Sequence, residues 1–137
     1  MNAVTQALYD RLAGDGILIG MLATYEAEPA VFTIDPAPGD AVLPYIVSAG
    51  DVVDAAWDTK TGLGRRIWRD VRCYAAADGD AMLIEEIAER VRRLLHRRPL
   101  AVAGYAGIVA ECSGPIKADE QDAYGRIVTI RMMLEET

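Results

Sequence analysis

Histidine, cysteine and lysine are scarce in this sequence. His96 is the only histidine, Cys73 and Cys112 are the only cysteines, and Lys60 and Lys117 are the only lysines among 14 basic residues. One histidine and two distant cysteines cannot supply the three or four ligands that a zinc site needs. A serine, histidine and aspartate triad would depend on a histidine at a basic helix end. The sequence therefore predicts no metal, no cofactor and no catalytic activity.

Long apolar runs and an export signal are also missing. The first apolar stretch, residues 17–23, is too short to cross a bilayer. Asp10 and Asp15 precede it, at positions where a signal peptide is positively charged. Because the cysteines lack the dense spacing of a secreted disulfide-rich domain, we expect buried free thiols in a reducing cytoplasm. The sequence indicates a soluble globular protein with no membrane partner.

Motifs that bind phosphate or calcium are absent as well. The glycine-rich residues 14–20 follow a helix-like segment, whereas a dinucleotide-binding loop follows a strand. Residues 58–62, DTKTG, lack the glycines that lead to the lysine of a phosphate-binding loop. The acidic residues Asp119, Glu120 and Asp122 lack the glycine and the distal glutamate of a calcium loop. We interpret the three segments as a helix break, a loop and a solvated turn.

The chain has enough apolar material for one core. Its 137 residues are 52% hydrophobic and 26% charged, with no internal repeat and no domain boundary, so we expect a single domain over residues 1–137. The net charge of −7 argues against binding to a phosphate backbone. Arginine, whose planar guanidinium suits ion pairs at protein interfaces, gathers in two groups. These are Arg65, Arg66, Arg69 and Arg72, then Arg90, Arg92, Arg93, Arg97 and Arg98.

Apolar spacing predicts elements in the order helix, strands, helix, strands. The expected helices cover residues 4–13 (with Asn2 as N-cap), 17–22 and 78–98, and the expected strands cover residues 30–34, 45–53, 64–76, 107–112 and 124–135. The stripe expected to be buried on the longest helix contains Ile84, Ile87, Val91, Leu94 and Leu95. Residues 35–44, 57–64 and 113–122 are expected to be loops. This order predicts an α+β fold, a mainly antiparallel sheet of about four to five strands with helices packed on one face.

The strand predicted over residues 64–76 has two different faces. One face is apolar and is interrupted only by Arg69; its other members are Ile67, Val71, Cys73 and Ala75. The opposite face carries Arg66, Trp68, Asp70, Arg72 and Tyr74. Because Trp, Tyr and Arg are enriched at protein interfaces, we favour an interface for this second face. Two alternatives stay open: a single-stranded nucleic acid stacked on the aromatic rings, and a solvated face whose aromatics are covered by arginine stems.

Several segments occur in a recognisable order. A helix leads to a proline-rich stretch ending in LPYIV (residues 43–47), DTKTG (58–62) precedes the long strand, a helix ends in LLHRRPL (94–100), and an apolar strand lies near the C-terminus. This ordered set resembles the tail-completion, or tail-terminator, proteins of long-tailed phages and gene transfer agents. The likeness spans nearly the whole chain. The arginine-dense segment RRIWRDVRCYA (65–75) departs from it, since the family carries fewer charges there.

The resemblance implies a structural virion protein, made in the cytoplasm of a bacterial host. It would form a homo-oligomeric ring, typically a hexamer, on the head-proximal end of the tail tube, stop tube polymerisation and join the tail to the head. Its partners would be the major tail tube protein and a head-completion (stopper) protein. Because a ring closes through two different patches on each subunit, we expect Arg66, Trp68, Arg72 and Tyr74 in one patch and Glu85, Glu86, Asp119 and Asp122 in the other. Asp58, Thr59, Lys60 and Thr61 are expected to contact the tube or the neck.

Two other functions stay open at this point. The first is a head-completion or adaptor protein at another position in the neck of the same particle. The second, from a different class, is an accessory nucleic-acid-binding protein that uses the arginine-rich strand, although without sequence specificity. Acidic residues on and beside that strand weaken the second alternative.

Overall fold

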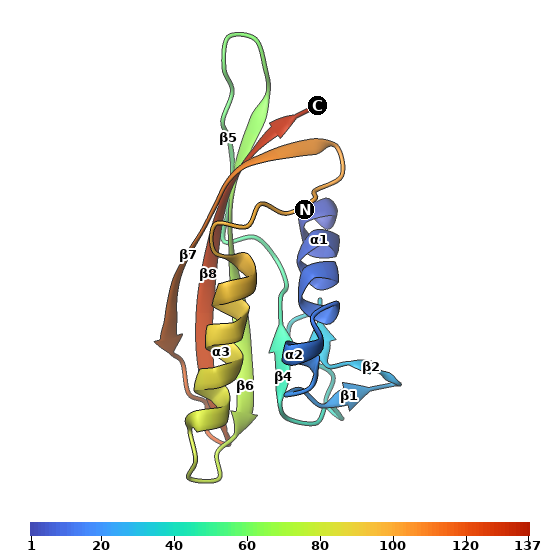
Figure 1. Cartoon of the computed structure of the whole chain (residues 1–137), viewed down its shortest axis with the longest axis vertical. Helices are drawn as coiled ribbons and strands as arrows, with labels where there is room; N and C mark the ends of the chain where they lie inside the picture. The colour runs from blue at the N-terminus through green and yellow to red at the C-terminus, as the bar shows by residue number, and fades with distance from the viewer.

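Figure 1 shows a long, curved sheet with helices packed against it. The computed structural model describes the backbone of residues 1–137 and every side chain except that of Ile108. The elements in chain order are α1 (Asn2–Ala13), α2 (Gly16–Ile19), β1 (Thr24–Tyr25), β2 (Glu28–Pro29), β3 (Val31–Phe32), β4 (Tyr45–Val47), β5 (Val53–Ala56), β6 (Gly64–Ala76), α3 (Met82–Leu95), β7 (Tyr105–Lys117) and β8 (Ala123–Glu136). None of the helices in the described chain is both long enough and apolar enough to span a bilayer.

Six strands form the main sheet, in the spatial order β3-β4-β6-β8-β7, with β5 also paired to β6. All of its pairs are antiparallel except β3 with β4, so the α+β class and the mainly antiparallel sheet are confirmed. The predicted count of four to five strands is wrong because the strand expected over residues 45–53 divides into β4 and β5. Gly50 adopts a φ of +77° between them, and Asp51 turns its side chain toward Arg69. The short β1–β2 sheet was not predicted from the sequence.

The three longest strands lie side by side. β6 spans residues 64–76, as expected, and pairs with β8 from end to end. β7 and β8 are both longer than the expected ranges, and β7 continues into residues 113–117, which were expected to be a loop. A register shift between Ser113 and Ile116 accommodates Gly114 and Pro115, so pairing resumes beyond them. The loop between β7 and β8 is therefore only residues 118–122.

The helices begin and end differently from the expected ranges. α3 does not start at residue 78, because the Asp78 and Asp80 carboxylates accept the backbone N–H groups of Asp80 and Met82 in a turn before the helix. It ends at Leu95, since His96 has extended backbone angles. In α1, Met1 rather than Asn2 is the N-cap residue. α2 is a four-residue helix, Gly16–Ile19, instead of the expected 17–22.

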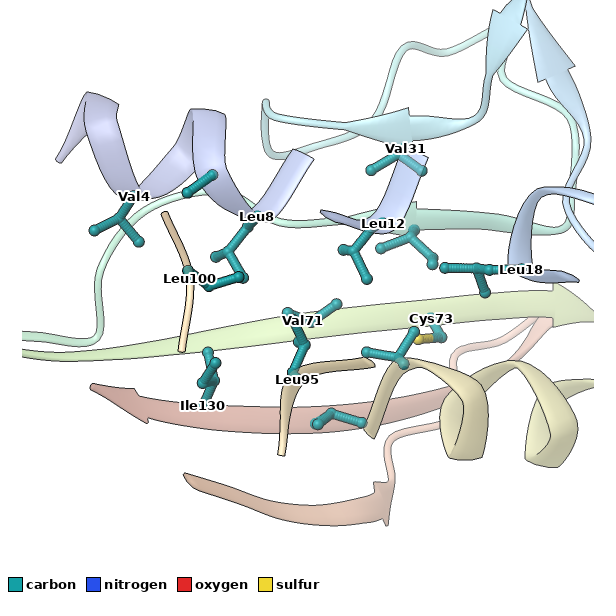
Figure 2. Packing of buried hydrophobic residues seen from close by; sticks show 14 of the residues in the cluster. Val4, Leu8, Leu12, Leu18, Val31, Val71, Cys73, Leu95, Leu100 and Ile130 are labelled. Carbon is teal, nitrogen blue, oxygen red and sulfur yellow. The ribbon is translucent and has the colours of Figure 1, made fainter. Parts of the chain in front are cut away.

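The main core lies between the helices and the inner face of the sheet, and Figure 2 shows its packing. Leu12 of α1, Val71 of β6 and Leu95 of α3 are fully buried in it. The predicted inner residues of β6 (Ile67, Val71, Cys73 and Ala75) all belong to this core. Leu94 was expected to be buried, but it lies half-buried at the edge because Leu95 takes the inward position. Burial of these apolar groups is the main force that holds the helices on one face of the sheet.

Arg69, which interrupts the apolar face of β6, is completely buried. Its guanidinium donates to Asp51 Oδ1 from Nε at 2.9 Å and from Nη2 at 2.7 Å, and Nη1 donates to Thr5 Oγ1 at 2.6 Å. The amino group of Met1 donates to the other Asp51 oxygen at 2.8 Å. Burial by itself would raise the pKa of Asp51, but hydrogen bonds from the Met1 amino group and from Arg69 outweigh it and lower this pKa. The cluster joins α1 to the break between β4 and β5.

Candidate interaction surface

The face of the sheet opposite the helices is open. It is formed by alternate residues of β6, β8 and β7, and we call it the outer sheet face. Its members are Arg66, Trp68, Asp70 and Arg72 of β6, Ile127, Thr129, Arg131 and Met133 of β8, and Val109 and Glu111 of β7. The residues between them in β6 and β8 point into the core with the helices. Each of the ten retains some exposure to solvent, so this face is available to a partner.

Trp68 lies near one end of the outer sheet face, beside an arginine. Arg131 is its register partner on β8, and the Arg131 Cζ lies 4.6 Å from the centroid of the Trp68 ring. This distance suits a cation–π interaction, which also screens part of the ring from water. Along the same two strands, Thr129 donates a hydrogen bond to Asp70 Oδ1 at 2.6 Å. These contacts hold the side chains in place on the face.

Tyr74 lies inside the protein, unlike the other residues predicted on this face. It is only 7% exposed and belongs to a second, smaller core with Phe32 and Val47. Its ring centroid lies 5.6 Å from that of Tyr45, which in turn contacts Phe32 at 5.5 Å. Burial raises the pKa of the Tyr74 hydroxyl above its ordinary value. The structure thus places Tyr74 in the fold of the subunit and leaves Arg66, Trp68 and Arg72 exposed or half-buried.

The four residues predicted in the second patch, which we call the acidic patch, divide into two pairs. Glu85 and Asp119 are both bound by Arg126, whose Nε donates to Glu85 at 2.7 Å and whose Nη1 donates to Asp119 at 2.9 Å. Asp119 also accepts the backbone N–H of Gly125, and that bond is the largest of the contacts that lower its pKa. Glu86 and Asp122 are exposed and, among the described residues, form no ion pair. Arg126 was not identified from the sequence, since nothing local links β8 to α3.

The loop of Asp58, Thr59, Lys60 and Thr61 forms the tip of the β5–β6 hairpin, which projects past the helices in Figure 1. All four residues are exposed. The backbone N–H of Thr59 donates to the Gly62 carbonyl at 2.9 Å, and the Asp58 carboxylate accepts the N–H of Gly64 at 3.1 Å. Beside the tip, Leu63 is 59% exposed. The hairpin therefore presents a defined turn with one apolar side chain.

A groove of about 590 Å³ lies between α2 and α3, and we call it the α2–α3 groove. It is lined by Ile17, Met21, Glu86, Glu89, Arg90, Arg92, Arg93, His96 and Arg98. Two hydrogen bonds from Arg90 to the Asp15 carboxylate, at 2.9 and 2.7 Å, hold the start of α2 against α3. These bonds are the main reason that the pKa of Asp15 is lowered. The sequence did not reveal this groove, because the two residues that position α2 are 75 apart.

The free edge of β7 is occupied along its middle by Arg92 of α3 and by the two residues that follow this helix. The backbone N–H of Arg97 donates to the Ala110 carbonyl at 2.8 Å, and the Cys112 N–H donates to Nδ1 of His96 at 3.0 Å. Arg92 Nη1 donates to the carbonyls of Cys112 and Gly114, at 3.1 and 2.9 Å. The backbone groups here that could otherwise form hydrogen bonds with another strand are therefore already bonded.

The side chains considered above for catalysis or metal binding, His96, Cys73 and Cys112, have structural roles in the fold. His96 is used on the edge of β7, and burial raises the pKa of Cys73 to about 12 and that of Cys112 to about 11, which disfavours the reactive thiolate. Among the described residues there is no group of three or more His, Cys, Asp or Glu side chains placed to hold a metal.

Known proteins share this fold. A family model described as tail completion protein gp17 matches residues 6–135. Among solved structures, one chain of the virion of a native gene transfer agent particle matches with a TM-score of 0.80 and 20% identity, over 98% of this chain and 96% of that chain. The gp17 protein of bacteriophage SPP1 matches with a TM-score of 0.58 and 21% identity, over 96% of this chain and 88% of that chain. Among curated proteins, none matches the chain.

Proposed function

Because the chain belongs to the family of tail completion protein gp17, we propose that it forms a ring on the head-proximal end of a tail tube, ends tube polymerisation there and joins the tail to the head. Tail completion proteins are structural proteins of the virion and not enzymes, so the chain has a structural role in a tail. The ring, its six copies, its head-proximal position and its partners in tube and neck are the parts that we propose.

The observation that carries the proposal is the open outer sheet face. Trp68, Met133 and Val109 are apolar and only half-buried on it, and exposed Arg66 and Arg131 stand beside them. A face that combines half-buried aromatic and aliphatic groups with arginine has the composition of a protein interface. In the ring, this face is the seam between neighbouring subunits.

A ring also needs a second patch that differs from the first. The acidic residues Glu85 and Glu86 lie on α3, in the layer of helices, while Asp119 and Asp122 lie in the loop between β7 and β8. These positions support a head-to-tail contact, since the outer sheet face lies on the other side of the sheet from α3. Glu86 and Asp122 are the members of the patch best placed to bind a neighbour, because Arg126 already binds Glu85 and Asp119.

The β5–β6 hairpin supports a contact with a different partner. The tip of this hairpin projects from one end of the subunit (Figure 1) and carries the exposed residues Asp58, Thr59, Lys60 and Thr61. In the proposed particle this tip contacts the tube or the neck. Loops held on a rigid pair of strands are common positions for such binding residues.

Electron microscopy of particles made without this protein tests the proposed function. We expect tails longer than those of the wild type and separate from heads, because nothing ends tube growth. Tails of normal length that are merely detached from heads would instead indicate an adaptor of the neck. Normal tails joined to heads would overturn the proposal.

A further inference from the structure

The subunit has a sheet face that its own helices do not cover and, on its layer of helices, the α2–α3 groove. We propose that the α2–α3 groove of one copy receives the outer sheet face of the next copy, so that the helices of each subunit cover the open sheet of its neighbour. This inference rests on the proposed ring. In this arrangement the outer sheet face contacts the α2–α3 groove, and Glu89 joins Glu86 in the acidic patch.

Apolar groups occur on both surfaces. In the groove, Ile17 is 61% exposed on α2, and Met21 lies beside it at the groove wall. On the outer sheet face, Trp68 is the largest half-buried apolar side chain. An aromatic ring that enters a neighbour's groove becomes fully desolvated, which is typical of the residues that dominate binding energy. We therefore place Trp68 against Ile17 and Met21 of the next copy.

Both surfaces carry charges of both signs, so carboxylates of each can pair with arginines of the other. Glu86 and Glu89 line one end of the groove, and Arg93 lines it one turn further along α3, about 6 Å beyond Glu89 at 1.5 Å per residue. Among the described residues, none of these three forms an ion pair. On the outer sheet face, Arg66 and Arg131 supply cations. Glu111, the register partner of Arg131, supplies an exposed anion.

The groove is also ready to bind without rearrangement. Arg90 is held by Asp15, and Arg92 is held by the carbonyls of Cys112 and Gly114, so both walls are fixed in the isolated subunit. A surface that is ordered before binding avoids much of the entropy cost of association. Arg93 and Arg98 remain available for a carboxylate such as Glu111 of the neighbour.

The two surfaces belong to different layers of the subunit, so one copy cannot satisfy both by itself. Each copy brings one groove and one outer sheet face, and the contact is therefore heterologous. Such a contact continues from copy to copy in one direction and closes into a ring when the rotation per step divides a full turn. A two-fold dimer would instead pair a surface with itself.

Reversal of charge on each surface tests the pairing. Arg66→Glu/Arg131→Glu changes the outer sheet face, and Glu86→Arg/Glu89→Arg changes the groove. We expect each variant alone to associate at least about tenfold more weakly than the wild type, because like charges then face each other. An equimolar mixture of the two should assemble again in alternating order, since its contacts then join either two reversed surfaces or two wild-type surfaces. Light scattering measures the mass, and circular dichroism checks that each variant is folded.

A matched control separates the groove from net charge. Glu26→Arg/Glu28→Arg changes the charge as much as the groove variant does, on the exposed β1–β2 hairpin, and should assemble as the wild type does. An equal loss in this control, or a mixture of reversed variants that stays unassembled, would overturn the pairing. If only the arginine variant loses assembly, the seam on the outer sheet face stands and the groove is not its partner. A wild-type protein that is monomeric at every concentration and on tube ends would overturn the ring itself.

Discussion

Arg69 donates two hydrogen bonds to the same oxygen of Asp51, and neither side chain is more than 9% exposed. A buried ion pair of this kind adds little net stability compared with apolar residues, but the loss of one partner leaves an uncompensated charge in the core. Since the two side chains join β6 to the segment after Gly50, they fix the place where the edge of the sheet divides into β4 and β5.

We expect Asp51→Ala to destabilise the subunit by about 3–5 kcal/mol, because Arg69 then remains buried without a carboxylate. Urea unfolding followed by circular dichroism at neutral pH measures the change. Asp54→Ala is the control, since its ion pair with Arg65 is about one third exposed and such pairs contribute about 0–1 kcal/mol. Equal effects of the two substitutions would contradict the role of the buried pair.

The stabilising effect of Asp51 should also depend on pH. Its pKa is lower in the folded than in the unfolded chain, so its contribution is complete above the unfolded value of about 3.9 and is lost as pH falls through the folded pKa. We therefore expect the difference in unfolding free energy between wild type and Asp51→Ala to shrink below about pH 4. A series of urea titrations at decreasing pH checks this, and a difference that stays constant would contradict it.

Neighbouring leucines on α3 should respond differently to truncation. Leu95→Ala removes a fully buried side chain and should cost about 2–5 kcal/mol. Leu94→Ala should cost less, because Leu94 lies half-buried at the edge of the core. Thermal or urea unfolding of both variants gives the comparison. If Leu94→Ala proved the more damaging, α3 would face the sheet with a different side.

Trp68→Ala should leave the subunit folded and weaken the ring by about 2 kcal/mol or more for each contact, if the ring closes through the outer sheet face. Trp57→Ala removes the same type of side chain beside the β5–β6 hairpin and should leave assembly unchanged. Light scattering at a series of concentrations measures both. Identical oligomers of Trp68→Ala and wild type at the same concentration would show that this face is not the seam, and the outward residues of β8 would then be tested next.

Removal of the side chains that occupy the edge of β7 should promote aggregation. In Arg92→Ala/His96→Ala, the N–H of Cys112 and the carbonyls of Cys112 and Gly114 lose their side-chain partners. Unpaired backbone groups on an edge strand invite pairing with another chain. Turbidity and thioflavin fluorescence on incubation measure the effect. Arg93→Ala is the control on the same helix, and aggregation at the same rate in both would contradict the explanation.

The elements predicted well from the sequence are those set by local periodicity. β6 has an apolar face that only Arg69 interrupts, so the bounds of the strand and the inward positions of Ile67, Val71 and Cys73 were predicted correctly. The break at Gly50 was missed because the apolar residues on both sides of it favour one continuous strand. β7 was predicted too short because Gly114 and Pro115 are typical of loops, whereas the register shift that accommodates them depends on pairing with β8.

The positions of individual surface residues depended on contacts that are distant in sequence. Tyr74 follows the alternation of the outer sheet face, yet Tyr45 and Phe32 bury it in a second core. Glu85 is an ordinary exposed helix residue until Arg126, 41 residues later, binds it. No periodicity or composition encodes such pairings, since they arise only when separate strands and helices are brought together. The face and four of its five predicted β6 residues (Arg66, Trp68, Asp70 and Arg72) were predicted from the sequence, whereas the burial of Tyr74 was not.

The occupied edge of β7 also affects how such a protein can change its partners. Arg92 and His96 already bond the middle of β7, the long edge strand of the sheet. Another protein would therefore gain few backbone hydrogen bonds there, and its recognition depends on side chains elsewhere. Backbone pairing is almost indifferent to sequence, whereas contacts between side chains alter with single substitutions. A few substitutions of surface side chains can then adapt this subunit to a new partner while the sheet beneath them remains the same.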